Sequence, residues 1–240
     1  MGSVTYSGPL VMRGVISDNS VLHPSCPMPK TPIISESVII NDDETISNVV
    51  VYIADDMSGH VFIPPSEPIV LDARNWRFVP HVVGIQAGQL IHFRDCEAVP
   101  GSHAFTLITD KQVFPKSPTR LTDIPHSAPF PLQLCSGSKA CPPGQHYHFF
   151  SMSHDEPFTE VFSTPEIPLR LIDITYPWMS AYICVFAHPF FNVTNGAGVF
   201  LLDGVPAGEY AVVSWHETLG TRKQTVTVEE GKPTKITIRY

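Results

Sequence analysis

The sequence predicts an all-β protein, and three observations lead to this fold class. Val, Ile, Thr and Phe recur in short runs between Pro, Gly, Asn and Asp, as is typical of strands joined by turns. Pro accounts for 24 of the 240 residues, and no long amphipathic helical period is visible. Hydrophobic residues make up 43% and charged residues 16%, which indicates a compact chain of one large or two small domains.

The C-terminal part has the clearest strand pattern. Residues 196–220 and 223–240 contain four short strand-like runs. Apolar residues in 199–202 and 210–213 follow the pattern expected of a half-buried sheet. Turn-forming residues stand between these two runs: Gly204, Pro206 and Gly208.

This C-terminal part, with its Gly-x-Phe-x-Leu run and Pro-x-Gly-x-Tyr turn, resembles the carboxypeptidase regulatory-like (transthyretin-like) sandwich. The two strands that normally begin such a sandwich are not found just upstream of it, but similar stretches occur at 10–18 and 46–56. We therefore expect residues 1–63 and 186–240 to form one discontinuous domain, interrupted by residues 64–185. The alternative is two sequential domains with a strand-rich N-terminal extension.

The interrupting segment resembles a cupredoxin. Residues 77–105 match the usual opening, with an aromatic-x-Pro run, a Gly turn and a strand that rises to a loop, and residues 165–191 match the copper-ligand loop. As a whole, the chain is similar to bacterial exported proteins that join a plastocyanin-like domain to a regulatory-like sandwich. The resemblance implies two β-sandwiches, with a Greek-key cupredoxin-like domain inserted into the other. Residues at about 110–155 depart furthest and are expected to be a long insertion.

The resemblance also implies a blue-copper site, but the residues at its ligand positions differ. Asp173 stands at the Cys position, Tyr176 and Pro100 stand at the two His positions, and only Met179 is retained. A blue-copper centre needs a thiolate and two imidazoles. We therefore expect that site to be absent and Met179 to be a core residue. Asp173 and Tyr176 are expected to hydrogen-bond within the vacated space, or alternatively to bind a harder metal.

Four histidines offer a different metal site. His81 and His103 belong to the family motifs outside the blue-copper set, and strand alternation directs both outward. His146 and His148 form a His-x-His pair, which on a strand places two imidazoles on one face, about 6.5–7 Å apart along the chain. If the insertion folds over the outer face, three or four histidines meet and bind copper or another metal that imidazole prefers. The alternatives are hydrogen-bonded histidines where the domains dock, and a surface pair without metal.

Two further histidines belong to family motifs near the C-terminus. His188 lies in an AHPFF run, and His216 is followed directly by Glu217, which is able to orient an imidazole. We expect these residues to form a polar clasp at the junction between the domains. A separate metal site is the alternative.

Composition limits the partners and the compartment. A net charge of −8 argues against binding to a nucleic-acid backbone, and no apolar run approaches the length of a transmembrane segment. The start, Met1-Gly2-Ser3, resembles an expression tag that replaces a removed signal peptide, so we expect a periplasmic or extracellular protein. Of the five cysteines, Cys135 and Cys141 have a spacing that suits a local disulfide, and the alternative is free thiols in a reducing compartment.

The sequence therefore predicts an exported metal-binding protein, with copper as the expected metal, on a cupredoxin that has lost its blue-copper site. One alternative is a copper-dependent oxidative enzyme that uses the histidine site. Another is a scaffold or interaction module without metal. The sequence indicates no catalytic residues and identifies neither a protein partner nor a small-molecule substrate.

Overall fold

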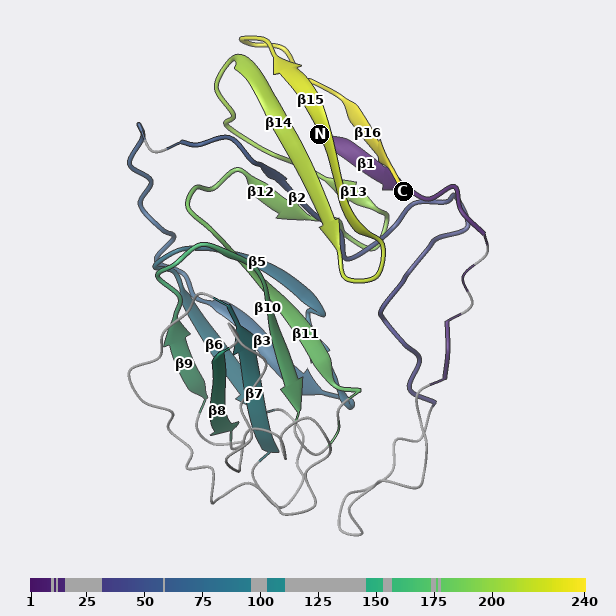
Figure 1. The fold of residues 1–240 in the computed structure, drawn as a ribbon, viewed down its shortest axis with the longest axis vertical. Helices are drawn as coiled ribbons and strands as arrows, with labels where there is room; N and C mark the ends of the chain where they lie inside the picture. The colour runs from purple at the N-terminus through teal and green to yellow at the C-terminus, as the bar shows by residue number, and fades with distance from the viewer. Residues whose placement is uncertain are drawn as a thin grey trace.

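The predicted all-β fold class is confirmed. The computed structural model describes residues 1–9, 11, 13–15, 32–57, 59–95, 103–110, 146–152, 157–173, 176 and 178–240, and within these ranges it contains strands and no helix. The strands form four sheets (Figure 1). The predicted insertion at about 110–155 lies outside the described residues apart from Asp110 and 146–152. The expected disulfide between Cys135 and Cys141 also lies outside them.

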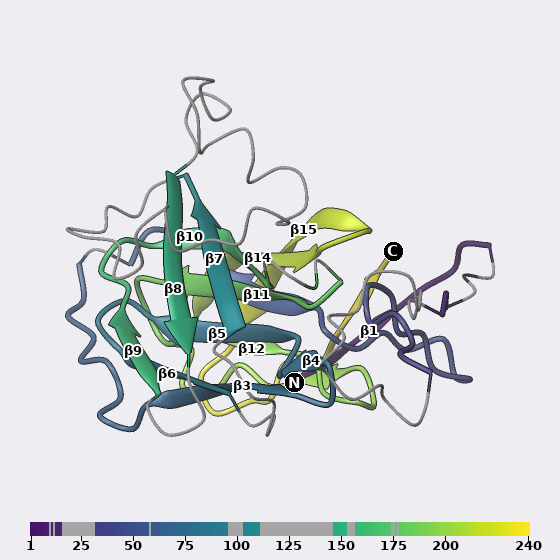
Figure 2. The same cartoon turned by 90° about the horizontal axis from the view of Figure 1, so that it is seen from below.

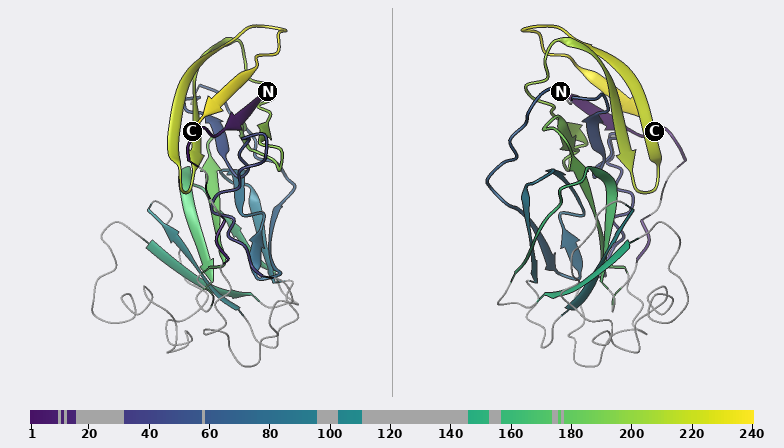
Figure 3. Two further views of the ribbon diagram at one scale, coloured as in Figure 1. Left: turned by 90° about the vertical axis from the view of Figure 1, so that its right-hand side faces the viewer. Right: turned by 60° about the vertical axis from the view of Figure 1, so that its left-hand side comes forward.

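Two sheets are built from both ends of the chain, and we call them the terminal sheets. One has the order β13-β1-β16 and the other β12-β2-β14-β15. Their bounds are β1 (Gly2–Thr5), β2 (Val50–Ile53), β12 (Phe191–Val193), β13 (Val199–Phe200), β14 (Gly208–His216), β15 (Gly220–Val228) and β16 (Ile236–Arg239). Both chain ends lie on these sheets (Figure 3). The division into domains 1–63, 64–185 and 186–240 stays a prediction.

The first strand differs from the sequence expectation. A strand was expected within 10–18, of which the structure describes only 11 and 13–15. The observed β1 lies earlier, and Val15 makes an isolated bridge to Ile34. Val15 is exposed, whereas Val4 of β1 is fully buried. Gly2 permits the pairing with β16, because a Cβ at this position would lie 2.5 Å from the Ile236 carbonyl oxygen.

The two sheets from the middle of the chain, the central sheets, pack around an aromatic core. Their orders are β5-β11-β10-β7-β8 and β4-β3-β6-β9. Their bounds are β3 (Ile69–Arg74), β4 (Arg77–Val79), β5 (Val82–Gln86), β6 (Leu90–Asp95), β7 (His103–Thr109), β8 (His146–Met152), β9 (Phe158–Val161), β10 (Glu166–Asp173) and β11 (Ser180–Phe186). Phe78, Phe93, Phe105 and Phe150 are buried between them.

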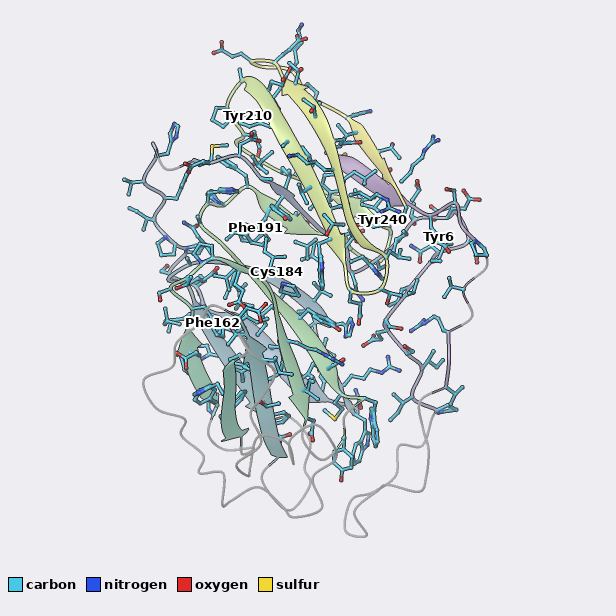
Figure 4. All side chains as sticks on the ribbon, viewed as in Figure 1. Tyr6, Phe162, Cys184, Phe191, Tyr210 and Tyr240 are labelled. Atoms are coloured by element: carbon cyan, nitrogen blue, oxygen red, sulfur yellow. The ribbon has the colours of Figure 1, made fainter. Side chains whose placement is uncertain are left out.

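A third apolar cluster joins the terminal and central sheets. It contains Val50, Val82, Cys184 and Phe186, and Figure 4 shows Cys184 and Phe191 where the two groups of sheets meet. Cys184 is a buried free thiol. The cluster places polar residues near the junction in a water-poor environment, which matters for the histidines described below.

Residues 32–37 also cross this junction. Ile33 is buried in the core of the central sheets, although it belongs to the N-terminal segment. A guanidinium nitrogen of Arg77 lies 3.3 Å from the Glu36 carboxylate, and the Thr218 hydroxyl donates to the Ser37 carbonyl oxygen. This segment therefore contacts both groups of sheets.

Candidate functional site

The loop that matches the copper loop of cupredoxins is closed by its own hydrogen bonds. Asp173 is fully buried, and its Oδ1 accepts the backbone N–H of Tyr176 at 2.9 Å. The N–H of Met179 donates to the Tyr176 carbonyl oxygen, and the N–H of Asp173 donates to the Met179 carbonyl oxygen. The Tyr176 ring packs edge-on against Trp76, with centroids 4.8 Å apart. As expected from the sequence, Met179 is a core residue.

The donors in this loop do not match blue copper. Asp173 and Tyr176 supply a carboxylate and a phenol, whereas a blue-copper ion needs a thiolate and two imidazoles. Pro100, at the remaining position of the set, lies outside the described residues. The Asp173 carboxylate is already hydrogen-bonded within the turn, so we derive no chemistry from a blue-copper ion here.

His81 lies at the junction between the terminal and central sheets. It directly precedes β5, and its Nε2 is hydrogen-bonded to a carboxylate oxygen of Glu217, which follows β14. The side chains are only 9% and 12% exposed. Burial, followed by the negative charge of Glu217, raises the pKa of the neighbouring Tyr182 to about 12. His81 is thus a hydrogen-bonded residue at the junction between the two groups of sheets, which was the alternative to metal binding.

His188 and His216 also form structural hydrogen bonds, but those of His216 stay within its own turn, so the expected clasp at the domain junction stays a prediction. His188 Nδ1 accepts the N–H of Phe190, and its Nε2 donates to the Ile53 carbonyl oxygen at 3.1 Å. His216 Nδ1 accepts the N–H groups of Thr218 and Leu219, both at 3.2 Å. Burial lowers the pKa of both imidazoles, that of His216 to about 4.

His148 has a different environment, at the edge where the two central sheets meet. Strands β8 and β9 lie side by side there (Figures 1 and 2). The imidazole is 2% exposed and lies against Phe150 and Phe158, with ring centroids 6.1 Å away in each case. Its Nε2 lies 3.8 Å from Oε2 of Glu160 on β9. Burial lowers the pKa of His148 to about 4.

The sheet topology separates the four histidines proposed as metal ligands. His103 pairs with Met152 at one end of the β7–β8 ladder and His146 pairs with Thr109 at the other end, roughly 20 Å apart. His81 adjoins β5, which is four strand spacings or roughly 19 Å from β8. Of the four histidines, the topology thus brings together only His146 and His148, which are two residues apart on β8. It places the backbone of His103 toward the other end of the β7–β8 ladder and that of His81 at the opposite edge of the sheet.

Metal ligation by the histidines stays a prediction. Within the described ranges, no group of three or more His, Cys, Asp or Glu side chains is arranged to hold a metal ion. The sequence interpretation missed Glu160. A signal for it was present, because Phe158 and Glu160 alternate with residues of the other face on a short strand that follows the histidine pair.

Comparisons with known proteins return structural similarity only. No family model and no curated protein matches this chain. The Cu-containing nitrite reductase (NirK) from Thermus scotoductus SA-01 is similar to 53% of this chain, with 17% identity and a TM-score of 0.32, and the match spans 24% of its own length. Amicyanin from Paracoccus versutus matches 57% of this chain over 97% of its own, with 12% identity and a TM-score of 0.31. A mutant plastocyanin of fern matches 49% over 99% of its own, with 18% identity and a TM-score of 0.26.

At these identities and TM-scores we draw no conclusion about metal or activity from the similarity. Separately, none of the described residues forms a helix that is long and apolar enough to span a membrane.

Proposed function

We propose that this is an exported metal-binding protein that has lost the blue-copper site and binds its metal through His146 and His148 on β8, with Glu160 as a third ligand. The observation that carries the proposal is the 3.8 Å separation of His148 Nε2 and Glu160 Oε2 at the sheet edge. The domain division given above, with residues 64–185 inserted between 1–63 and 186–240, is part of the same proposal.

The separation of the two atoms suits shared coordination. Metal–nitrogen and metal–oxygen bonds at protein sites are about 2.0–2.2 Å long, so two ligands of one tetrahedral ion lie about 3.3–3.6 Å apart. A small rotation of the Glu160 side chain is enough to reach this spacing. Glu160 is partly exposed and its other oxygen, Oε1, accepts the Val161 N–H, so Oε2 is the atom directed to His148.

His146 completes the set by its place in the sequence. It lies two residues before His148 on the same strand, and strand alternation directs both residues to one face. Two imidazoles and one carboxylate leave an open position on a tetrahedral ion. Imidazole and carboxylate donors suit Cu(II) or Zn(II), and copper is the metal that the sequence resemblance implies.

A metal-free scaffold is the second candidate, and a specific observation favours it. His81 and His188 are engaged in hydrogen bonds that join secondary-structure elements, and His216 Nδ1 binds its own turn. A chain that uses its histidines in this way has no need for a metal. The two candidates differ in metal content alone.

Metal analysis decides between them. The purified protein is equilibrated separately with Cu(II) and Zn(II), desalted and analysed by mass spectrometry of the elements. We expect one metal ion per chain, strongly reduced in His146→Ala and His148→Ala and weakened in Glu160→Gln. His60→Ala serves as the control, because His60 is exposed and far from β8 in the sequence.

Two outcomes would contradict the proposal. Retention of metal by both the His146 and His148 variants would move the site elsewhere. Absence of stoichiometric metal in the unmodified protein would leave the scaffold as the function that remains.

A further inference from the structure

A second feature lies between the two terminal sheets: an apolar cavity of about 470 Å³ that is partly open to solvent. Its lining includes residues 232–235 in the turn between β15 and β16. That turn lies at the end of the terminal sheets away from the central sheets (Figures 1 and 3). The floor of the cavity consists of three buried core residues: Ile53, Phe200 and Val212. Its walls include partly buried apolar side chains, among them Leu202, Val226 and Ile236.

The size and lining of this cavity match a small-molecule site. Such sites are concave, mostly apolar and about 300–1,000 Å³ in volume. It is separate from the proposed metal site, because β8 and β9 belong to the central sheets.

The mouth of the cavity carries positive charge. Lys232 and Lys235 line it, and Lys232 is paired with Glu229 at 2.6 Å. Lys235 is exposed, and no acidic side chain of the described residues forms an ion pair with it. Asp203 is the acidic residue in the lining, and its Oδ1 accepts the N–H of Gly204.

The C-terminal segment of the sequence is basic although the whole chain is acidic. Within residues 220–240 there are five basic residues (Arg222, Lys223, Lys232, Lys235 and Arg239) and two acidic ones (Glu229 and Glu230), which gives a net charge of +3 against −8 for the chain. Of these basic residues, Lys232 and Lys235 line the cavity, whereas Arg222 and Lys223 lie toward the far end of β15.

From the cavity and its charged mouth we infer a binding site for an amphipathic carboxylate, with an acyl or aryl body between the terminal sheets and the carboxylate beside Lys235. The apolar body removes the partly buried walls from water, which is the main favourable contribution. The ammonium of Lys235 selects the anionic head group, because no carboxylate among the described residues forms an ion pair with it. This inference is independent of the proposed metal binding.

The test uses the full chain and decanoate as the probe, titrated by calorimetry below its micellar concentration. We expect saturable binding of one decanoate per chain and much weaker binding of decyltrimethylammonium, which has the same tail and the opposite charge. Lys235→Glu is expected to weaken decanoate binding about fivefold or more. Lys223→Glu is the matched control, because it makes the same charge change on an exposed basic residue outside the cavity.

A cavity-filling variant provides a second readout. Val226→Phe places a ring in the cavity and is expected to abolish decanoate binding. If this variant does not fold, the pair of lysine variants still decides the matter.

Three results would overturn the inference. They are the absence of saturable decanoate binding, equal binding of decyltrimethylammonium, and equal weakening by Lys235→Glu and Lys223→Glu. The last would mean that overall charge, and not this cavity, attracts the anion.

Discussion

His216 is a buried neutral histidine, and its position predicts how the stability of the protein depends on pH. It is 1% exposed, and Nδ1 accepts two backbone N–H groups, so protonation at this nitrogen would break both hydrogen bonds. Burial lowers the pKa of His216 from 6.5 to about 4. Two smaller effects are the charge of Glu217, which raises this pKa, and that of His81, which lowers it further. Because Nδ1 accepts, Nε2 carries the proton, and it has no hydrogen-bond partner among the described residues.

The sign of the pH effect follows from this lowered pKa. Between pH 6.5 and 4 the unfolded chain binds a proton at this histidine and the folded protein does not, so the free energy of unfolding falls as the pH falls through this window. A difference of about two and a half pKa units corresponds to a loss of about 3 kcal/mol from His216 over the whole window. Above pH 6.5 the contribution is fully present.

The variant that isolates this effect is His216→Asn. The amide oxygen takes the place of Nδ1 and still accepts the two N–H groups, but the side chain no longer titrates. Urea unfolding is followed by tryptophan fluorescence at pH values from 7 to 4.5. As the pH falls, the free energy of unfolding of the unmodified protein should approach that of His216→Asn by about 2–3 kcal/mol, because only the unmodified protein loses the contribution of this histidine. The exposed His60→Asn serves as the control for the substitution itself. Parallel pH curves for the unmodified protein and His216→Asn would refute the reasoning.

Two further predictions concern the loop at 173–179 and the junction. Asp173→Ala removes the acceptor of the buried Tyr176 N–H and should lower the free energy of unfolding by about 1–3 kcal/mol. Asp173→Asn keeps an acceptor and should lower it less. Equal urea midpoints for the unmodified protein and Asp173→Ala would contradict this role of the carboxylate. Gly84→Ala would place a Cβ 2.7 Å from the Phe191 ring and should cost about 1–3 kcal/mol in thermal unfolding, whereas Gly59→Ala, which has open space around it, should cost little. Similar effects of the two glycine substitutions would argue against close packing at the junction.

Strands with a clear apolar pattern, such as β13 and β14, were predicted from the sequence, whereas β1, which has none, was not. Strand β13 lies within the run at 199–202, the run at 210–213 lies within β14, and Gly204 between them has a φ of +69°. Strand β1 was not predicted because the apolar run at 10–15 is stronger than that at 2–5. Of that stronger run, Val11 and Val15 are described and are exposed. A local pattern does not reveal which apolar segment finds a partner, because the partner strand β16 lies more than 200 residues away.

The candidate site was predictable only where it is local. The His146–His148 pair lies on one strand, as its spacing indicates. Whether this pair lies near His81 and His103 depends on the order of the strands in the sheet, which cannot be deduced from a local sequence pattern. The observed order places β5 and β8 at opposite edges of one sheet. The Glu217 partner of His81 was equally hidden, because 136 residues separate the two in the sequence.

The central sheets contain two buried polar sites, the loop at 173–179 and the β8–β9 edge, and they differ in how their polar side chains are used. In the loop at 173–179, the Asp173 carboxylate closes the turn, so the loop is held without a metal ion. At the β8–β9 edge, His148 is buried among Phe150 and Phe158 with the Glu160 carboxylate nearby, and an apolar residue there would extend the aromatic core without the cost of burying an imidazole. Places where a sequence departs from the choice that packing favours tend to be functional. On this physical ground the proposed metal site is the sheet edge and not the loop at 173–179.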